Sequence, residues 1–301
     1  MLTFPVVAGV IEQGLVYSLM ALGVYITFRV LDFPDLSVDG SFPLGAAVSA
    51  KLIVDGYNPF VALVVALAAG LAAGAFTGFL NTRLRISSLL AGILTMTALY
   101  SVNLRIMGRA NIPLLMEPTF LTLLEKAGIP SEYVALVSFF VLVVVVKLVL
   151  DWFLHTEVGF ALRATGDNPI MIRSLGVNTD RMKVFGLAIS NGLVAFSGGL
   201  VAQYQGFADV GMGIGTIVTG LASVIIGEVL FHPRRVVTQV LSVIIGSMVY
   251  RLAIFLALRL GFAPTDLKLV TTVLVIIALA APTFSRWRKQ AKLLPKSAAG
   301  A

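Results

Sequence analysis

DFPDLSVDGSFPLG, residues 32–45, is the stretch that decides how this sequence folds. It carries three carboxylates, two prolines, two glycines and two serines, yet strongly apolar segments precede and follow it. At membrane depth, such polar and helix-breaking residues are tolerated only where they are buried in protein or line a water-filled cavity. The stretch therefore predicts an interrupted membrane helix with a specific role.

The composition indicates an integral membrane protein. Of the 301 residues, 58% are hydrophobic and 12% are charged, whereas a soluble domain carries about a quarter charged residues. Several apolar runs reach about 20 residues, the length that crosses a hydrocarbon core of about 30 Å. Cysteine is absent, which excludes a disulfide framework and a thiolate metal site. The net charge is +7, but most of the basic residues lie at the ends of apolar segments, so we expect no nucleic-acid partner.

Nine apolar segments are predicted to be helices, because lipid offers the backbone no hydrogen-bond partners outside its own segment. The predicted fold class is an all-α polytopic bundle of about nine membrane helices, in one domain over residues 1–301. The second and seventh segments are short and rich in glycine, serine or threonine. The nine segments span residues 5–28, 38–54, 60–80, 87–107, 134–153, 184–204, 214–231, 238–258 and 267–284.

Basic residues predict the orientation. Alternate loops together with the tail, residues 285–301, hold fourteen lysines and arginines, and the opposite loops and span ends hold six. Because basic residues accumulate on the cytoplasmic side, the amino terminus is predicted outside and the carboxyl terminus inside. No basic stretch precedes Pro5, so segment 5–28 is predicted to be a retained span, not a cleaved signal.

A short internal similarity suggests a repeat. Gly-Leu-Val at residues 14–16 is followed by Phe-Pro-Asp-Leu at 33–36, and Gly-Leu-Val at 192–194 is followed by Phe-Ala-Asp-Val at 207–210. By the predicted topology the two Phe-x-Asp turns face opposite sides. Inverted repeats with interrupted helices are a plan of transporters; a chance match of a few residues is the alternative.

The residues of the opening stretch leave two interpretations. Asp35 and Asp39 are four apart and would share a helix face that lines a solute path, since a carboxylate facing lipid costs a few kcal/mol. Alternatively, Ser37 or Asp39 caps a helix that starts near Ser41 or Pro43 in a cytoplasmic loop. The two interpretations are compatible, because a re-entrant loop also needs a cap.

The longest predicted cytoplasmic segment, residues 155–183, contains two short helical patterns. The first is predicted to end with Gly166 as its stop. Asp167 or Asn168 is predicted to cap the second, residues 169–175, which begins with a proline. This amphipathic helix suits docking into a groove of a partner protein; the alternative is a helix lying on the lipid surface.

The same segment resembles a loop of bacterial ATP-binding-cassette (ABC) importer permeases of the branched-chain amino acid and ribose class. They carry Gly-x-x-x-Arg-Ala, then an Asn, then Gly-Ile/Val-Asn. In that family the loop forms the coupling helix that contacts the ATPase subunit. The resemblance and the capping pattern assign ATPase coupling to Gly159, Arg163, Ala164, Gly166, Asp167, Asn168, Pro169, Arg173, Gly176 and Asn178.

Other elements share the resemblance, which covers roughly residues 14–279. Residues 35–40 resemble an Asp-Leu-Ser-Val-Gly element of the sugar-type members, but Asp39 stands where they have glycine, which puts a sugar substrate in doubt. The closest likeness is to a subgroup linked to tryptophan or tyrosine uptake. The first conserved span and a late element of the family are matched at Tyr17, Ala21, Gly23, Gly227 and Glu228.

The resemblance implies a permease subunit of an ATP-driven importer in the bacterial plasma membrane. The expected partners are ABC ATPase subunits, an external solute-binding protein, a second permease subunit in a homodimer, and the lipid bilayer. The expected fold is that of a type II importer, with inverted halves at residues 5–107 and 184–284 and a coupling loop at 154–183. The expected solute is an amino acid, with an aromatic one suggested by the subgroup; a sugar, a nucleoside or a branched-chain amino acid are the alternatives.

This chain itself is not expected to be an enzyme or to bind a cofactor. It contains no Gly-x-x-x-x-Gly-Lys-Ser/Thr motif, so ATP and Mg²⁺ are expected on the partner ATPase. An ion-gradient-driven transporter using Asp35, Asp39 or Glu12 is the rival, although it leaves the coupling-type loop unexplained. Residues expected to line the solute path are Asp35, Ser37, Asp39, Ser41, Thr219, Ser223 and Glu228.

Two charged residues within predicted spans keep alternatives open. Glu228 could pair with Arg234 or Arg235 in the following turn instead of lining the path. Arg251, about two turns inside the eighth span, could reach the outer face beside Arg259 or point into a lumen.

Overall fold

The computed structural model describes residues 4–126, 128, 130–263, 266, 269, 271–273, 276 and 280. Helices make up most of this part, with one ribbon of two short strands, β1 (Asn111–Pro113) and β2 (Phe207–Asp209). The helices are α1 (Phe4–Tyr25), η1 (Ile26–Val30), α2 (Val38–Val54), α3 (Pro59–Thr82), α4 (Ser88–Met107), α5 (Phe120–Lys126), α6 (Ser131–Leu154), α7 (Glu157–Asp167), α8 (Pro169–Ser174), α9 (Thr179–Gln205), η2 (Val210–Gly213), α10 (Thr216–Phe231) and α11 (Val236–Arg259).

Eight of the nine predicted membrane segments coincide with helices: α1, α2, α3, α4, α6, α9, α10 and α11. Within the described residues, seven helical segments are long and apolar enough to cross a membrane, and α2, with 17 residues, is not among them. The prediction of a helical, multi-pass membrane protein is confirmed. Most of the ninth predicted segment, 267–284, and all of the basic tail, 285–301, lie outside the described residues.

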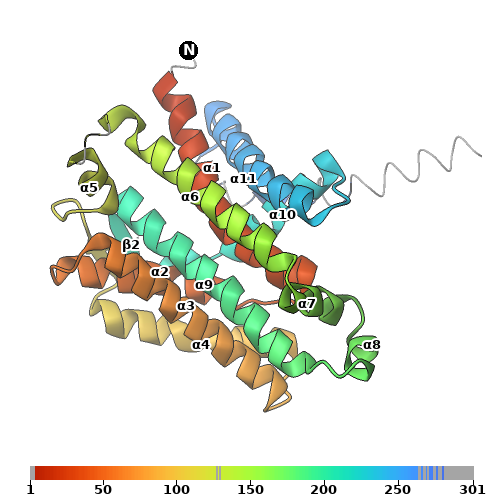
Figure 1. The fold of residues 1–301 in the computed structure, drawn as a ribbon. Helices are drawn as coiled ribbons and strands as arrows, with labels where there is room; N and C mark the ends of the chain where they lie inside the picture. Colours follow the sequence, from red (N-terminus) through yellow and green to blue (C-terminus); the bar gives the residue numbers. More distant parts are fainter. Residues whose placement is uncertain are drawn as a thin grey trace, which may run out of the picture.

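Helix α9 is the centre of the packing. It contacts α3 and α2 on one side and α1 on the other, while α1 also packs against α10 and α11 (Figure 1). Small residues permit these contacts: a Cβ on Gly70 or Gly74 of α3 would clash with carbonyl oxygens of α9, and one on Gly198 of α9 with the Phe42 carbonyl of α2. Close backbone approach at small residues is a common way for membrane helices to associate.

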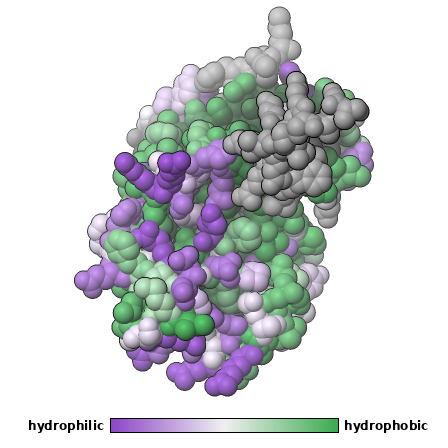
Figure 2. All heavy atoms as spheres, turned by 90° about the vertical axis from the view of Figure 1, so that its right-hand side faces the viewer, coloured by the Kyte–Doolittle hydropathy of each residue, from purple (hydrophilic) through white to green (hydrophobic). Residues whose placement is uncertain are grey.

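The two ends of the bundle differ (Figure 1). At one end β1 pairs antiparallel with β2, with Ile112 opposite Ala208, and α5 lies nearby; we call this the ribbon end. At the other end lie α7 and α8, and we call it the α8 end. Figure 2 faces the side that carries α7 and α8, and it shows hydrophilic residues gathered across that side with hydrophobic residues along its flanks.

At the α8 end, α1 finishes in the π-helical turn η1, a feature often found at functional sites. The chain then turns through residues 31–37, where Asp32 has a left-handed φ of 50°. The Phe33 N–H donates to the Thr27 carbonyl at 2.9 Å, which folds the turn back against η1. The interruption predicted from the opening stretch therefore lies between η1 and α2.

Candidate functional site

Helix α7 packs across the end of α1. Thr156 caps α7 by accepting a hydrogen bond from the Gly159 N–H at 3.3 Å. A Cβ on Gly166 would clash with the Val30 carbonyl oxygen of η1, and one on Gly159 with the end of α6. The predicted role of Gly166 as a helix stop is corrected, because the helix continues to Asp167. Its missing side chain instead allows α7 to lie directly on η1.

Asn168 separates α7 from α8. Of the two predicted caps, it is Asn168 that accepts a hydrogen bond from the Met171 N–H, at 3.0 Å. Three apolar side chains of this segment point outward, since Ile170, Met171 and Leu175 are 83%, 58% and 66% exposed. Helix α8 is thus a short capped helix with exposed apolar side chains, which suits docking into a groove of another protein.

The turn after α8 attaches it to α9. Gly176 takes a left-handed φ of 88°, and the Asn178 side chain accepts hydrogen bonds from the Asp180 and Arg181 N–H groups at 3.1 and 3.0 Å. Arg173 of α8 donates to the Asp180 carboxylate at 3.1 Å. All ten residues predicted for coupling lie in this contiguous segment, residues 156–178, which we call the α7–α8 unit.

A hollow of about 530 Å³ lies where the α7–α8 unit meets the ends of α1 and α11. Arg163 and Asp167 line it from α7, Arg29 and Asp32 line it from the end of α1, and Arg234 lines it from the turn before α11. The Nε of Arg163 is buried and, within the described residues, has no hydrogen-bond partner. The hollow therefore combines three guanidinium groups with two carboxylates beside the predicted coupling segment.

Glu228 joins α10 to this end of the molecule. Its carboxylate forms an ion pair with Arg29 of η1, at 2.8 Å. The alternative partners considered from the sequence, Arg234 and Arg235, do not form that pair within the described structure. Helices α7 and α10 are thus both attached to η1, the first by packing and the second by charge.

Asp35 lies in a buried hydrogen-bond network in the turn after η1. Its carboxylate accepts hydrogen bonds from the Ser37 N–H at 2.9 Å, from the Ser37 hydroxyl at 2.5 Å and from the Asn191 side-chain amide of α9 at 2.8 Å. Asp35, Ser37 and Asn191 are 3%, 0% and 0% exposed. The network fastens the turn to the central helix, and a buried polar network is stabilising when every member is paired.

Asp39, four residues later, connects two helices that are far apart in the sequence. Its carboxylate accepts hydrogen bonds from the Gly215 N–H at 3.0 Å, the Ile217 N–H at 2.7 Å and the Thr216 hydroxyl at 2.9 Å. Asp39 was considered as a cap for its own helix, but α2 begins earlier, at Val38. It caps α10 instead, where anionic charge favours the helix amino terminus. The two short helices predicted from the sequence therefore meet at their first turns.

The two Phe-x-Asp turns share a local conformation. Asp35 accepts from the N–H of Ser37 at 2.9 Å, and Asp209 accepts from the N–H of Gly211 at 2.7 Å, so each carboxylate bonds the backbone two residues on. Asp209 lacks a buried partner comparable to Asn191 and is half-buried. The predicted inverted halves stay a prediction, to which this likeness adds one geometric feature.

The residues predicted for the solute path differ in how far they are buried. Ser41 and Ser223 are buried, and the Ser223 hydroxyl donates to the Thr219 carbonyl at 2.8 Å. Asp39, Thr219 and Glu228 are partly exposed. Among the described residues, no three His, Cys, Asp or Glu side chains gather to form a metal site.

Sequence reasoning missed Asn191, whose position in the middle of a membrane segment was the available signal, since polar residues there are usually functional. It also left Arg251 of α11 undecided. The Arg251 guanidinium lies over the Tyr17 ring, 3.5 Å from its centroid, and Tyr17 stacks on Phe42 with centroids 5.7 Å apart. The Arg251 Nε is buried and finds no hydrogen-bond partner in the described part of the chain.

Comparisons with known proteins agree with the helical architecture. The family described as the branched-chain amino acid transport system / permease component matches residues 6–280. A tyrosine transport system permease protein of Clostridioides difficile (strain R20291) is 46% identical over 292 residues, which are 96% of this chain and 96% of that protein. An uncharacterized protein of Rickettsia prowazekii (strain Madrid E) is 36% identical over 274 residues, 90% of this chain and 95% of that one.

A more distant relative and the solved structures complete the comparison. The ribose import permease protein of Escherichia coli (strain K12) is 24% identical over 193 residues, which are 62% of this chain and 57% of that protein. No solved structure matches this chain.

Proposed function

This chain belongs to the family of permease components of the branched-chain amino acid transport system, and from that premise we propose that it is the membrane subunit of an ATP-driven amino acid importer. The observation that carries the proposal is the α7–α8 unit. Helix α8 offers exposed apolar side chains. Helix α7 lies with its backbone at Gly166 directly against η1, at the end of α1.

Coupling follows from this packing. An ATPase that moves α8 would move α7, because Asn168 closes one helix and caps the other. Movement of α7 would pass through Gly166 to η1 and then to the turn fastened by Asp35. Packed helices switch between discrete arrangements, so a small displacement at this end can change the packing of α1 and α2 as whole helices.

The proposed solute is an amino acid, with tyrosine the first to test. Support comes from the relative of Clostridioides difficile, whose name gives tyrosine transport and which is 46% identical along nearly the whole chain. Within the membrane span, Arg251 lies eight residues before the end of α11, about 12 Å along the helix. We propose that this guanidinium meets the carboxylate of the passing solute, because an intramembrane charge marks a solute pathway more often than a packing role.

The proposed assembly contains two copies of this chain, two ATPase subunits on the α8 end and a solute-binding protein on the ribbon end. The α8 end then faces the cytoplasm and the amino terminus lies outside, in agreement with the basic residues of alternate loops. The solute path runs between the two copies. This chain carries out no hydrolysis, and ATP and Mg²⁺ bind the partner.

Reconstitution tests the proposal. The permease, its ATPase subunits and its binding protein are reconstituted in proteoliposomes, with ATP enclosed in the lumen, which takes the place of the cytoplasm. Uptake of radiolabelled tyrosine into the lumen is then measured. The proposal expects uptake that requires hydrolysis. Uptake that continues with a hydrolysis-deficient ATPase and stops when a proton or sodium gradient is collapsed would establish the rival secondary transporter.

A matched pair of variants tests the docking role of α8. Ile170→Asp places a charge on α8, and Leu115→Asp places the same charge near the ribbon end, at a residue with the same exposed fraction of 83%. The proposal expects the first variant to lose copurification with the ATPase and the second to retain it. Equal retention by both variants would remove α8 from the docking surface.

A further inference from the structure

A groove of about 990 Å³ lies beside the crossing of α3 and α9 at the α8 end. It shares no lining residue with the hollow around Arg163 or with the predicted solute path, and it meets the α7–α8 unit at Val158 and Asn178. Its depth comes from close helix approach, since a Cβ on Gly78 of α3 would lie 2.7 Å from the Val184 Cα of α9. The side chains that line it form three layers.

The two helices present the same three layers to the groove. On α3 and just after it, Arg83 lies at the rim, Phe79 one turn deeper and Ala75 one turn deeper again. On α9 the corresponding layers are Arg181, Phe185 and Ala188. Residues three or four apart share a helix face, so each helix contributes a cation, an exposed ring and a small residue in the same order.

The rim carries uncompensated positive charge. Arg83, Arg85 and Arg181 are exposed and, among the described residues, none of the three forms an ion pair with a carboxylate. The acidic residue of the rim, Asp180, is already paired with Arg173 at 3.1 Å. Arg85 has a left-handed φ of 55° in the turn that places it beside Arg83. Three arginine side chains therefore border one opening.

Below the rim the walls are apolar and open. Phe79 is 48% exposed and Phe185 is 41% exposed, although both belong to helices that cross the membrane. Ala75 and Ala188 lie one turn further along the two helices, so the rings border a furrow with a small, apolar inner end. Such a furrow fits an acyl chain, whereas a free anion or an acidic peptide would make no use of it.

We infer that this groove binds an anionic phospholipid, with its phosphate on the arginine rim and an acyl chain between Phe79 and Phe185. Guanidinium groups bind phosphate through paired hydrogen bonds, and basic pockets between membrane helices bind anionic head groups. The groove also touches Val158 of α7 and Asn178, so the lipid lies against both α3 and the α7–α8 unit. The inference is independent of the transported solute.

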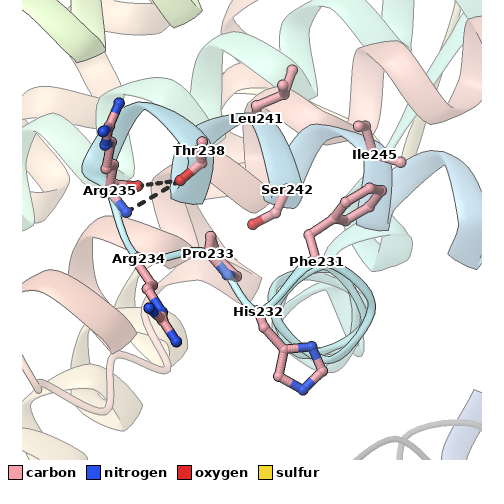
Figure 3. A pocket seen from close by; sticks show the side chains of 9 residues that line it. All are labelled: Phe231, His232, Pro233, Arg234, Arg235, Thr238, Leu241, Ser242 and Ile245. Atoms are coloured by element: carbon pink, nitrogen blue, oxygen red, sulfur yellow. Dashed lines mark hydrogen bonds between the residues drawn. The ribbon is translucent and has the colours of Figure 1, made fainter.

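The chain offers a matched control in a second basic pocket, drawn in Figure 3. This pocket of about 420 Å³ lies at the turn between α10 and α11 and is also lined by two arginines and apolar residues. In Figure 3 the side chains of Arg234 and Arg235 extend in opposite directions, so they do not converge on one phosphate. The backbone N–H of Arg235 donates to the Thr238 hydroxyl at 3.2 Å, a bond that stabilises the turn before α11.

Native mass spectrometry of the full-length permease tests the inference, with phosphatidylglycerol and phosphatidylcholine as probes. The expected result is preferential retention of phosphatidylglycerol, which weakens about fivefold for each arginine removed, by Arg83→Gln and by Arg181→Gln. Phe79→Ala should weaken retention of both lipids. Arg235→Gln should leave retention unchanged, and so should an excess of inorganic phosphate, because phosphate lacks the acyl chain.

Three results would overturn the inference. They are equal retention of the two lipids by the wild type, undiminished retention by the double variant Arg83→Gln/Arg181→Gln, and an equal loss in Arg235→Gln. A fourth result, displacement of phosphatidylglycerol when the ATPase subunits assemble, would also count against it, because an acidic segment of the partner would then occupy the rim in the importer. The arginines are exposed, so thermal melting of each variant should match the wild type and shows that it folds.

Discussion

Asp35 and Asp39 come from one short stretch, yet they lie in two different kinds of junction. Asp35 is buried and fastens its turn to α9 through Ser37 and Asn191. Asp39 is partly exposed and bridges two helix starts, since it lies in the first turn of α2 and caps α10. The first junction holds elements of a packed core together, while the second joins the first turns of two short helices through one partly exposed carboxylate. Sequence proximity therefore does not imply a shared role for two carboxylates.

The largest effect is expected for Asp35→Ala. The substitution leaves the Ser37 N–H and one N–H of the Asn191 amide buried without an acceptor, while the amide still donates to the Leu187 carbonyl at 3.1 Å. Each unsatisfied donor costs about 1–3 kcal/mol. We expect a loss of stability of about 3 kcal/mol or more, measured as thermal melting of the purified protein. Asp35→Asn retains one acceptor oxygen and should lose less; an equal, small loss in both would show that the network contributes little.

Gly166→Val tests whether the Asp35 junction receives motion from α7. The added side chain would clash with the Val30 carbonyl, and overpacking costs about 1–3 kcal/mol. We expect tyrosine uptake to fall more than ATP hydrolysis, measured together in proteoliposomes. Gly9→Ala is the control, because nothing lies within 4 Å of a Cβ at that position. Unchanged ratios of uptake to hydrolysis in Gly166→Val would argue against transmission through this contact.

Asp39→Ala should have a smaller effect on stability. Loss of a helix cap costs about 1–2 kcal/mol, and partial exposure allows water to replace the carboxylate at the Gly215 and Ile217 N–H groups. We expect a modest decrease in melting temperature but a clear change in transport, measured by uptake at equal protein in the membrane. A melting temperature lowered as far as in Asp35→Ala would mean that the two junctions do not differ as described.

Asp209→Ala should have the smallest effect of the four. Asp209 forms the same local bond as Asp35, to Gly211 at 2.7 Å, but without a buried partner. We expect a loss of about 0.5–1.5 kcal/mol, the net value of an ordinary hydrogen bond, again by thermal melting. If Asp209→Ala matched Asp35→Ala, the local turn rather than the contact with Asn191 would account for the stability of both.

Much of the fold was predictable because membrane helices have long apolar segments. Eight predicted segments coincide with helices, and the family resemblance was confirmed by the match over residues 6–280. The α5 helix, with seven residues, and the ribbon of three-residue strands were missed. Neither is long enough to show a period, and the ribbon pairs residues 111–113 with 207–209, which no local pattern encodes.

The sites were predictable where their determinants are local. Asn168, Pro169 and Gly176 mark the ends of α8 within a few residues, so this helix was found with nearly correct bounds. Gly166 was misassigned because a glycine that ends a helix and one that permits close packing look alike in sequence. Asp39 was recognised as a cap, but its donors lie 176 to 178 residues away, and only the fold brings them together.

The central claim is that the α7–α8 unit and the end of α1 move together under the ATPase. The chain has no cysteine, so spin labels can be placed at Glu157 of α7, at Phe28 of η1 and at Leu89 of α4, all exposed. Pulsed electron paramagnetic resonance then measures distances in the assembled importer, nucleotide-free and with ATP bound. The account predicts an unchanged 157–28 distance and a shifted 157–89 distance. A shifted 157–28 distance with an unchanged 157–89 distance would contradict it.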